Sequence, residues 1–312
     1  MERHRLAAGI DIGGTKIAIG LVDRQGTIQD QVTFSTESRN GIPDACQRIS
    51  KALTILIKNA GLQQSDLLGI GIGCPGPMNR ETGEILNPHT LPGWETLSLT
   101  KGLCNATGLP IALENDADAA LLGECFVGAG NGAAHVVMLT FGTGVGGAAL
   151  SAGQILRGVN DEHPEIGLIP VLPSEATDYS GVPGSLESIA SGSAIGNAGK
   201  KYGFKNSPAV FEAAAQGDAQ AIAIIDRART GITLACLSLA HTLCPERILL
   251  GGGLMDDHFD RFAPAIEMAL SKATLLPPNK ISVAKAMLGN LAGIVGAASL
   301  IFSHPAPLNS AR

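Results

Sequence analysis

The sequence predicts an α/β protein made of two related lobes, and three observations support this fold class. Predicted strands and helices alternate along most of the chain, which is typical of sheets covered by helices. The 312 residues exceed the usual size of a single hydrophobic core, so two domains are expected. A strand, a glycine turn and a second strand follow one another twice, at 7–22 and again from residue 135, which suggests two lobes that close on a shared ligand.

The first lobe opens with a hairpin whose turn is suited to binding an anion. Strands rich in Ile, Val and Ala are predicted at 7–12 and 16–22, and the glycines between them can adopt the positive φ of a tight turn. An anionic ligand can approach the backbone N–H groups of such a turn. Asp11, just before it, favours a ligand site over an ordinary hairpin. The turn residues expected to bind the anion are Gly13, Gly14, Thr15 and Lys16.

The remaining elements of the first lobe lead to a polar triplet. They are a strand at 27–35, a helix at 43–59, a strand at 67–73, a loop at 74–94, a helix near 97–106 and a strand at 111–113. Glu114, Asn115 and Asp116 come next, where the last strand gives way to an alanine-rich helix that ends near residue 127. Ligand groups lie at such positions in α/β sheets, although Asn and Asp are also common helix N-caps.

The second lobe repeats the opening pattern of the first. A strand at 135–141 precedes the glycine turn 142–147, and a returning strand starts at Ala148. The later elements are a polar loop at 161–184, helices at 186–198, 208–215 and 218–241, a strand at 247–250, a helix at 256–273, a strand at 280–284 and a helix at 290–302. We expect an N-terminal lobe at 1–117, a C-terminal lobe at 118–302 whose last helix can pack back on the first lobe, and a flexible tail at 303–312.

Composition argues against several functional classes. The net charge is −6 at pH 7 and Lys and Arg form no runs, which disfavours nucleic acid or an anionic membrane as a partner. No stretch approaches the roughly 20 apolar residues that span a bilayer, and the first strand begins without a cleavable signal, so a cytoplasmic protein is expected. The six cysteines are scattered without a CxxC pair, which indicates neither a disulfide framework nor a zinc knuckle.

Two GxGxxG segments, at 71–76 and 142–147, do not predict a dinucleotide site. That fingerprint stands between a strand and a helix, whereas prolines interrupt the first segment and a predicted strand follows the second. A dinucleotide-dependent oxidoreductase is therefore disfavoured. The chain also has no GxxxxGK[ST] sequence, so it is not a P-loop NTPase.

Seven motifs resemble, in order and spacing, those of the ROK family, which comprises bacterial sugar kinases, glucokinase-like enzymes among them, and sugar-responsive repressors. The resemblance spans nearly the whole chain. The motifs are Asp11-Ile-Gly-Gly-Thr-Lys16, Pro75-Gly-Pro77, Leu91-Pro-Gly-Trp94, Glu114-Asn-Asp-Ala-Asp118, Gly142-Thr-Gly-Val-Gly-Gly147, Gly184-Ser-Leu-Glu187 with Ala190-Ser-Gly192, and Gly251-Gly-Gly253. The resemblance implies the actin-like ATPase fold, with two ribonuclease-H-like lobes and with ATP and a sugar in the cleft.

The resemblance also implies roles for individual residues. Asp116 is expected to be the general base that takes the proton from the attacking sugar hydroxyl, and Asp11 to serve Mg²⁺ through water. The residues implied to contact the sugar are Gly76, Asn115, Asp116, Glu165 and Glu187. Those implied to bind ATP and its phosphates are Asp11, Gly13, Gly14, Thr15, Lys16, Gly142, Thr143, Gly144, Gly251, Gly252 and Gly253. A homodimer is the expected assembly.

The chain departs from the family in one stretch. Family members usually carry Gly-Glu-x-Gly-His and then Cys-x-Cys-Gly-x-x-Gly-Cys-x-Glu, whose His and three Cys bind a structural zinc beside the sugar. The four ligand positions are occupied by Leu168, Asp178, Ser180 and Ser185. One Asp and two hydroxyls cannot form a tetrahedral N/S site, so we predict no zinc. Either the loop 161–184 is held by packing instead, or sugar specificity has changed. His163 is a candidate stray ligand, but a lone surface histidine is the favoured expectation.

The leading hypothesis is an ATP- and Mg²⁺-dependent hexose kinase, with glucose 6-phosphorylation as the default reaction. Fructose, mannose or an N-acylated hexosamine are alternative acceptors, and polyphosphate is an alternative donor. A repressor is disfavoured by the acidic charge and by the few residues before the first strand. The altered loop suggests a sugar-binding regulatory protein without kinase activity, but the retained Asp11 and Asp116 argue against it.

Overall fold

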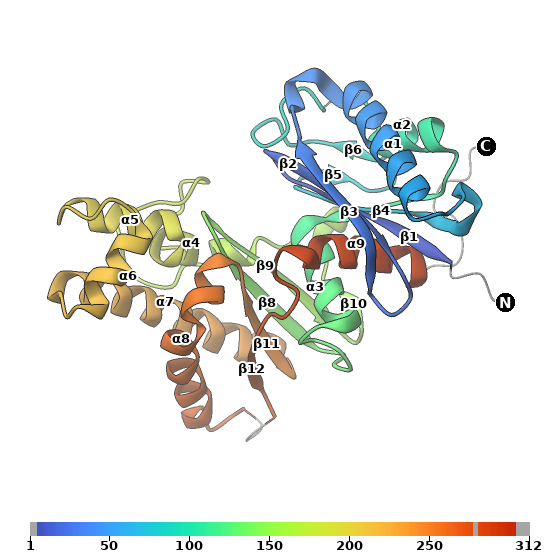
Figure 1. The fold of residues 1–312 in the computed structure, drawn as a ribbon. Coiled ribbons are helices and arrows are strands. Elements are labelled where there is room, and N and C mark those ends of the chain that lie inside the picture. Colours follow the sequence, from blue (N-terminus) through green and yellow to red (C-terminus); the bar gives the residue numbers. More distant parts are fainter. Residues whose placement is uncertain (1–4, 96, 277–279, 304–312) are drawn as a thin grey trace. The chain divides into compact units, whose positions relative to one another are not determined.

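The computed structural model describes residues 5–95, 97–276 and 280–303, which divide into two compact units. Unit 1 consists of the described residues up to Asn131, the segment Arg157–His163 and the described residues from Asn290 onward. Unit 2 consists of Gly132–Leu156 and the described part of Pro164–Gly289. Each unit has its own five-stranded sheet (Figure 1).

The sheet of unit 1 has the strand order β3-β2-β1-β4-β7. Its strands are β1 (Leu6–Ile12), β2 (Lys16–Val22), β3 (Ile28–Ser35), β4 (Leu67–Cys74) and β7 (Ile111–Asn115). The first three strands form an antiparallel meander, and β4 and β7 run parallel to β1. Asp11 pairs with Gly73, and Cys74 pairs with Asn115, so the C-terminal ends of β1, β4 and β7 lie along one edge.

Helices cover both faces of this sheet. They are α1 (Gly41–Asn59), α2 (Leu99–Thr107), α3 (Asp116–Val127) and α9 (Ala292–Ser303), and a short hairpin is formed by β5 (Met78–Asn79) and β6 (Glu84–Ile85). α1 and α2 share a core with Ile10 of β1, whereas α9 packs on the opposite face. A Cβ on Gly9 would lie 1.9 Å from the carbonyl oxygen of Ile294, and one on Gly71 would lie 1.7 Å from that of Ala297. Glycine at these two positions allows α9 to approach the sheet backbone.

The sheet of unit 2 has the order β10-β9-β8-β11-β12. Its strands are β8 (Val136–Phe141), β9 (Val145–Ser151), β10 (Gln154–Ile155), β11 (Arg247–Gly251) and β12 (Ser282–Lys285). The first three are antiparallel, and β11 and β12 run parallel to β8. In chain order, both units therefore arrange their five main strands as third, second, first, fourth and fifth.

Unit 2 has five helices within its described residues. They are α4 (Leu186–Ala190), α5 (Gly192–Lys200), α6 (Ser207–Ala215), α7 (Ala219–Leu243) and α8 (Gly253–Lys272). Of these, α8 and the short α4 contact strands of the sheet, and the others pack against neighbouring helices. Phe141 of β8, Ile232 of α7 and Phe262 of α8 belong to one buried core. No helix within the described ranges is both long and apolar enough to cross a bilayer.

Several boundaries differ from those expected. The helix predicted at 186–198 is two helices, because Ser191 is extended (φ −68°, ψ 159°) and its Oγ caps α5 by accepting the N–H of Ala194 at 3.0 Å. β9 starts at Val145 and α8 at Gly253, three residues earlier than expected in each case. α3 belongs to unit 1 and not to a second lobe starting at residue 118, because it packs on α9 and β4. The expected tail beyond Ser303 lies outside the described residues.

Candidate active site

The turn between β7 and α3 carries two residues predicted to contact the sugar. Asn115 is the N-cap of α3, and its Oδ1 accepts the N–H groups of Ala117 at 2.8 Å and Asp118 at 3.2 Å. Asp116 is the first helical residue, and its Oδ1 accepts the N–H of Ala117 at 2.9 Å. A Cβ on Gly76 would lie 3.4 Å from Nδ2 of Asn115. Asn115 can therefore serve both as a helix N-cap and as a sugar contact, because the cap uses Oδ1 while Nδ2 lies beside Gly76.

Two carboxylates at this edge of unit 1 have raised pKa values, and the charge of Asp116 contributes to the rise at Asp11. Burial raises the pKa of Asp11 to about 6, the charge of Asp116 adds to the rise, and that of Lys16 opposes it. Burial also raises the pKa of Asp116, while the N–H of Ala117 and the charge of His163 lower it. Mg²⁺ prefers carboxylate oxygens and water as ligands. A pair of poorly solvated carboxylates is stabilised by a divalent cation, so these donors fit Mg²⁺.

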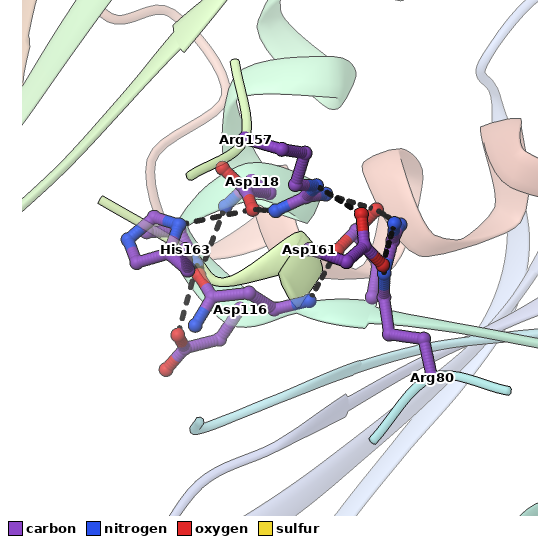
Figure 2. Close-up of polar contacts among 9 residues, drawn as sticks. Arg80, Asp116, Asp118, Arg157, Asp161 and His163 are labelled. Carbon is purple, nitrogen blue, oxygen red and sulfur yellow. Dashed lines mark hydrogen bonds and ion pairs between the residues drawn. The ribbon is translucent and has the colours of Figure 1, made fainter. Parts of the chain in front are cut away.

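An ion cluster surrounds Glu114 and Asp118, the two carboxylates that flank this turn. Figure 2 shows Asp118 with Arg157 and His163. Nη2 of Arg157 lies 2.6 Å from Oε2 of Glu114, and its Nη1 contacts Oδ2 of Asp118. Nη1 of Arg80 lies 2.8 Å from the same Glu114 oxygen, and this guanidinium also binds Asp161. The side chains of Glu114 and Asp118 are 5% and 0% exposed, whereas that of Asp161 is 49% exposed.

The expectation that His163 is a lone surface histidine is wrong. Its side chain is 13% exposed, and Nδ1 lies 3.0 Å from Oδ2 of Asp118. The cause is its place in the segment Arg157–His163, which packs within unit 1. The sequence pattern gave no signal for this contact, because 45 residues separate His163 from Asp118.

In unit 2 the turn between β8 and β9 is held by α4 and α5. The N–H of Gly142 donates to the carbonyl of Gly144 at 2.9 Å, and the carbonyl of Gly142 accepts the N–H of Gly192 at 2.8 Å. Oε2 of Glu187 accepts the N–H of Val145 at 3.0 Å. A Cβ on Gly144 would lie 2.4 Å from that Glu187 oxygen. Glycine at position 144 therefore allows the carboxylate to reach the turn.

A cavity of about 590 Å³ in unit 2 adjoins this turn. Gly142 and Thr143 line it together with Gly253, which follows β11. Phe211 and His258 also line it, with ring centroids 3.7 Å apart. Its volume is in the range of small-molecule and cofactor sites. Sequence reasoning found the glycines but missed most of the wall, which includes Asn197, Lys200, Lys205, Asn206, Phe211 and His258.

The loop that lacks the expected zinc ligands is closed by hydrogen bonds. Oδ1 of Asp178 accepts the N–H and the Oγ–H of Ser180 at 2.8 and 2.7 Å and the N–H of Val182 at 3.0 Å. Burial raises the pKa of Asp178, but hydrogen bonds including these outweigh it and lower the pKa. Ser185 caps α4 by accepting the N–H of Ser188 at 3.2 Å. In the described part of the chain, no three His, Cys, Asp or Glu side chains form a metal-binding group; the absence of zinc stays a prediction.

The predicted site residues fall into one group in each unit. Unit 1 contains Asp11, Gly13, Gly14, Thr15, Lys16, Gly76, Asn115 and Asp116, and unit 2 contains Gly142, Thr143, Gly144, Glu165, Glu187, Gly251, Gly252 and Gly253. Glu165 directly precedes a 3₁₀ turn at Ile166–Leu168 that packs on the start of β9. The predicted sugar contacts are thus divided, with three residues in unit 1 and two in unit 2.

Residues 7–303 match the model of the ROK family. The glucokinase of Thermotoga maritima is 35% identical over 309 residues, covering 94% of this chain and 96% of that one. The crystal structure of a ROK hexokinase from Thermus thermophilus superposes with a TM-score of 0.81 at 30% identity, covering 94% of this chain and 96% of that one. A ROK family glucokinase from Streptomyces griseus, solved in complex with glucose and AMPPNP, gives a TM-score of 0.74 at 28% identity over 96% of this chain and 100% of that one. An N-acetylmannosamine kinase of Escherichia fergusonii is 31% identical over 78% of this chain and 82% of that one.

These similarities confirm two expectations drawn from the motifs. The fold is the actin-like ATPase fold, since ROK kinase structures superpose over nearly the whole chain. The activity is that of a sugar kinase, since proteins named as glucokinases match over nearly the whole of both chains. The chain therefore belongs to the ROK family and is one of its sugar kinases.

Proposed function

We propose that this sugar kinase transfers a phosphoryl group from ATP to a hexose, with glucose as the acceptor and glucose 6-phosphate as the product. The observation that carries the proposal is Asp116, a half-buried carboxylate at the start of α3 with one oxygen bound by the N–H of Ala117. This hydrogen bond fixes the carboxylate, which is then able to accept the proton of a sugar hydroxyl as it attacks. General base catalysis of this kind contributes about 10²–10⁴ in rate.

The surroundings of Asp116 suit a base. Because burial raises its pKa, the carboxylate holds a proton more tightly than an exposed aspartate, which favours proton transfer from a hydroxyl. Nδ2 of Asn115, beside Gly76, is a hydrogen-bond donor for a sugar oxygen. Glu165 and Glu187 of unit 2 supply carboxylates that can accept hydrogen bonds from sugar hydroxyls. The proposal assigns these residues to orientation of the acceptor.

The donor site is assigned to two glycine turns and the cavity of unit 2. The turn 13–16 follows Asp11, and the turn 142–144 opens into the cavity of about 590 Å³. A nucleotide base and ribose need such a cavity, whereas polyphosphate does not, so the cavity favours ATP. Asp11 would hold Mg²⁺ through water; when bound, the ion offsets the negative charge of the phosphate groups. Lys16 carries a positive charge beside Asp11.

Glucose is proposed ahead of other hexoses because glucokinases at 35% and 32% identity cover nearly the whole chain. A relative named as an N-acetylmannosamine kinase covers less of the chain. Fructose, mannose and N-acylated hexosamines remain the alternatives to be tested. The hydrogen-bonded loop around Asp178 replaces the expected zinc loop, so the acceptor side of the site is where specificity is expected to differ among relatives.

A panel of acceptors tests the proposal. Purified protein is incubated with ATP, Mg²⁺ and one of glucose, fructose, mannose or N-acetylmannosamine, ADP release is recorded, and the phosphorylated carbon is located by NMR. The expected result is the highest kcat/KM with glucose and phosphate at O6. A higher kcat/KM with another sugar would show that this sugar, and not glucose, is the preferred acceptor. Binding of a sugar without ADP release by wild-type protein would contradict the catalytic role of Asp116. When Asp116→Asn is assayed beside the wild type, the matched control is Asp260→Asn, the same chemical change at an exposed residue of α8.

A further inference from the structure

The segment Arg157–His163 interrupts unit 2 in the sequence but packs within unit 1. Unit 2 contains the residues before it, up to Leu156, and those after it, from Pro164. The side chains of Arg157 and His163 are 15% and 13% exposed, and both contact Asp118 in the first turn of α3. Ionic contacts beside the turn at 115–116 therefore hold this segment on unit 1.

Arg157 bridges the strand and the helix that meet at this turn. Nη2 lies 2.6 Å from Glu114, in the last part of β7, and Nη1 contacts Asp118, the third residue of α3. Asn115 and Asp116 lie between these two carboxylates in the sequence. A guanidinium presents several N–H groups in a fixed plane, whereas the ammonium of lysine is a point charge on a flexible stem. The planar group is therefore suited to fixing the direction of β7 relative to α3.

Asp118 receives fewer hydrogen bonds than its burial demands. Its side chain is fully buried, and Oδ2 is contacted both by Arg157 and by Nδ1 of His163, from opposite sides in Figure 2. Oδ1 is buried and accepts no hydrogen bond in the described residues. A buried carboxylate with an unsatisfied oxygen is costly compared with a neutral side chain of the same shape. Stability alone does not explain a charged residue at this position.

We propose that Arg157, Asp118 and His163 form a positioning triad that fixes the turn bearing Asp116. Arg157 and Asp118 set the orientation of the first turn of α3, and His163 holds the same oxygen of Asp118 that Arg157 contacts. None of the three is assigned a contact with sugar or ATP. The inference rests on the proposed role of Asp116 as the general base.

The outer part of the cluster provides an internal comparison. Arg80 also binds Glu114, but its other partner is the half-exposed Asp161. Loss of Arg157 therefore leaves Glu114 with Arg80 and Asp118 with His163, so the folded protein retains a partner for each buried carboxylate. Asp161 has a positive φ of 66°, a conformation that asparagine adopts readily. Asp161→Asn is the matched control, because it makes the same chemical change as Asp118→Asn in the same cluster.

The test compares kinetics of Arg157→Lys, Asp118→Asn, His163→Gln, the double variant Asp118→Asn/His163→Gln and the control Asp161→Asn. Thermal unfolding confirms that each variant is folded, and kcat and KM are measured for ATP and for the preferred hexose. Arg157→Lys and Asp118→Asn are expected to lower kcat by about 10- to 100-fold, as for small displacements of a catalytic group. The KM for ATP should stay unchanged, and Asp161→Asn should retain wild-type kcat.

The double variant keeps the inference testable if a single change impairs folding. It replaces the buried charge and its histidine partner by two amides that can bond each other, so its loss of kcat should be smaller than the product of the two single losses. The triad would be overturned if the loss of kcat in the double variant equalled the product of the two single losses. It would also be overturned if Arg157→Lys and Asp118→Asn were as active as Asp161→Asn. Asp116→Asn is measured in parallel. If Asp116→Asn is inactive while the triad variants are fully active, only the triad is refuted; if Asp116→Asn is active, both proposals fail.

Discussion

Replacing Asp11 by asparagine should stabilise the unliganded protein at neutral pH while abolishing its activity. Burial and the charge of Asp116 raise the pKa of Asp11 from 3.8 to about 6. The folded protein thus binds this proton more tightly than the unfolded chain, so stability falls as the pH rises through this range and stays low above it. The difference corresponds to at most about 3 kcal/mol, because each pH unit is worth about 1.4 kcal/mol. Asparagine has nearly the same shape and no charge to bury.

The assay is thermal unfolding of wild type and Asp11→Asn at pH 4 and pH 8, with a chelator present. At pH 8 the variant should unfold at the higher temperature, by about 2–4 °C for each 1 kcal/mol in a unit of this size. At pH 4 the two curves should nearly coincide, because Asp11 of the folded wild type is then protonated. Asp260→Asn, on the surface of α8, should change neither. An equal stabilisation at both pH values, or a destabilisation at pH 8, would show that the charge of Asp11 does not destabilise the folded protein.

Three further predictions concern the base, the nucleotide cavity and the loop. The charge of His163 lowers the pKa of Asp116, and that of Asp118 raises it. In pH profiles of kcat/KM, His163→Gln should therefore raise the pKa of the acid limb, and Asp118→Asn should lower it. Shifts of the same sign in the two variants would contradict this prediction. Gly253 lines the cavity, and an added Cβ meets no protein atom within 4 Å. Gly253→Val should therefore raise the KM for ATP by about tenfold or more and leave the KM for sugar unchanged. An unchanged KM for ATP would show that the nucleotide does not bind in this cavity. Elemental analysis should find no stoichiometric zinc, because Asp178 is engaged by Ser180 and Val182; tightly held zinc would show that the loop has another arrangement.

The local features of the site could be predicted because short sequence patterns encode them. The hairpin around the turn at 13–16 follows from two apolar strands with glycines between them. Asn115 lies at a strand-to-helix boundary because Asn is a good N-cap, and the structure shows it in that position. The repeated strand, glycine turn and strand correspond to β1-β2 and β8-β9, which occupy equivalent places in two sheets of the same order. Such features depend on neighbours in sequence.

The long-range features could not be predicted in this way. Arg157 and Asp118 are separated by 39 residues, and nothing in the sequence around either residue indicates the partner. The extent of unit 1 was missed for the same reason, since α3 is assigned by its packing on α9, near the other end of the chain. The helix break at Ser191 was missed because serine is tolerated inside helices, and only its backbone conformation reveals that it caps α5.

Turnover and glucose binding, measured on the same variant of Asp116, separate a catalytic base from a residue that only binds the sugar. Wild type and Asp116→Asn are compared for ADP release with glucose, and glucose binding to both is measured by calorimetry. We expect kcat of the variant to fall by about 10²-fold or more, while the glucose dissociation constant changes only a few-fold. An Asp116→Asn variant that binds glucose and turns over at the wild-type rate would contradict the role of Asp116 as the general base.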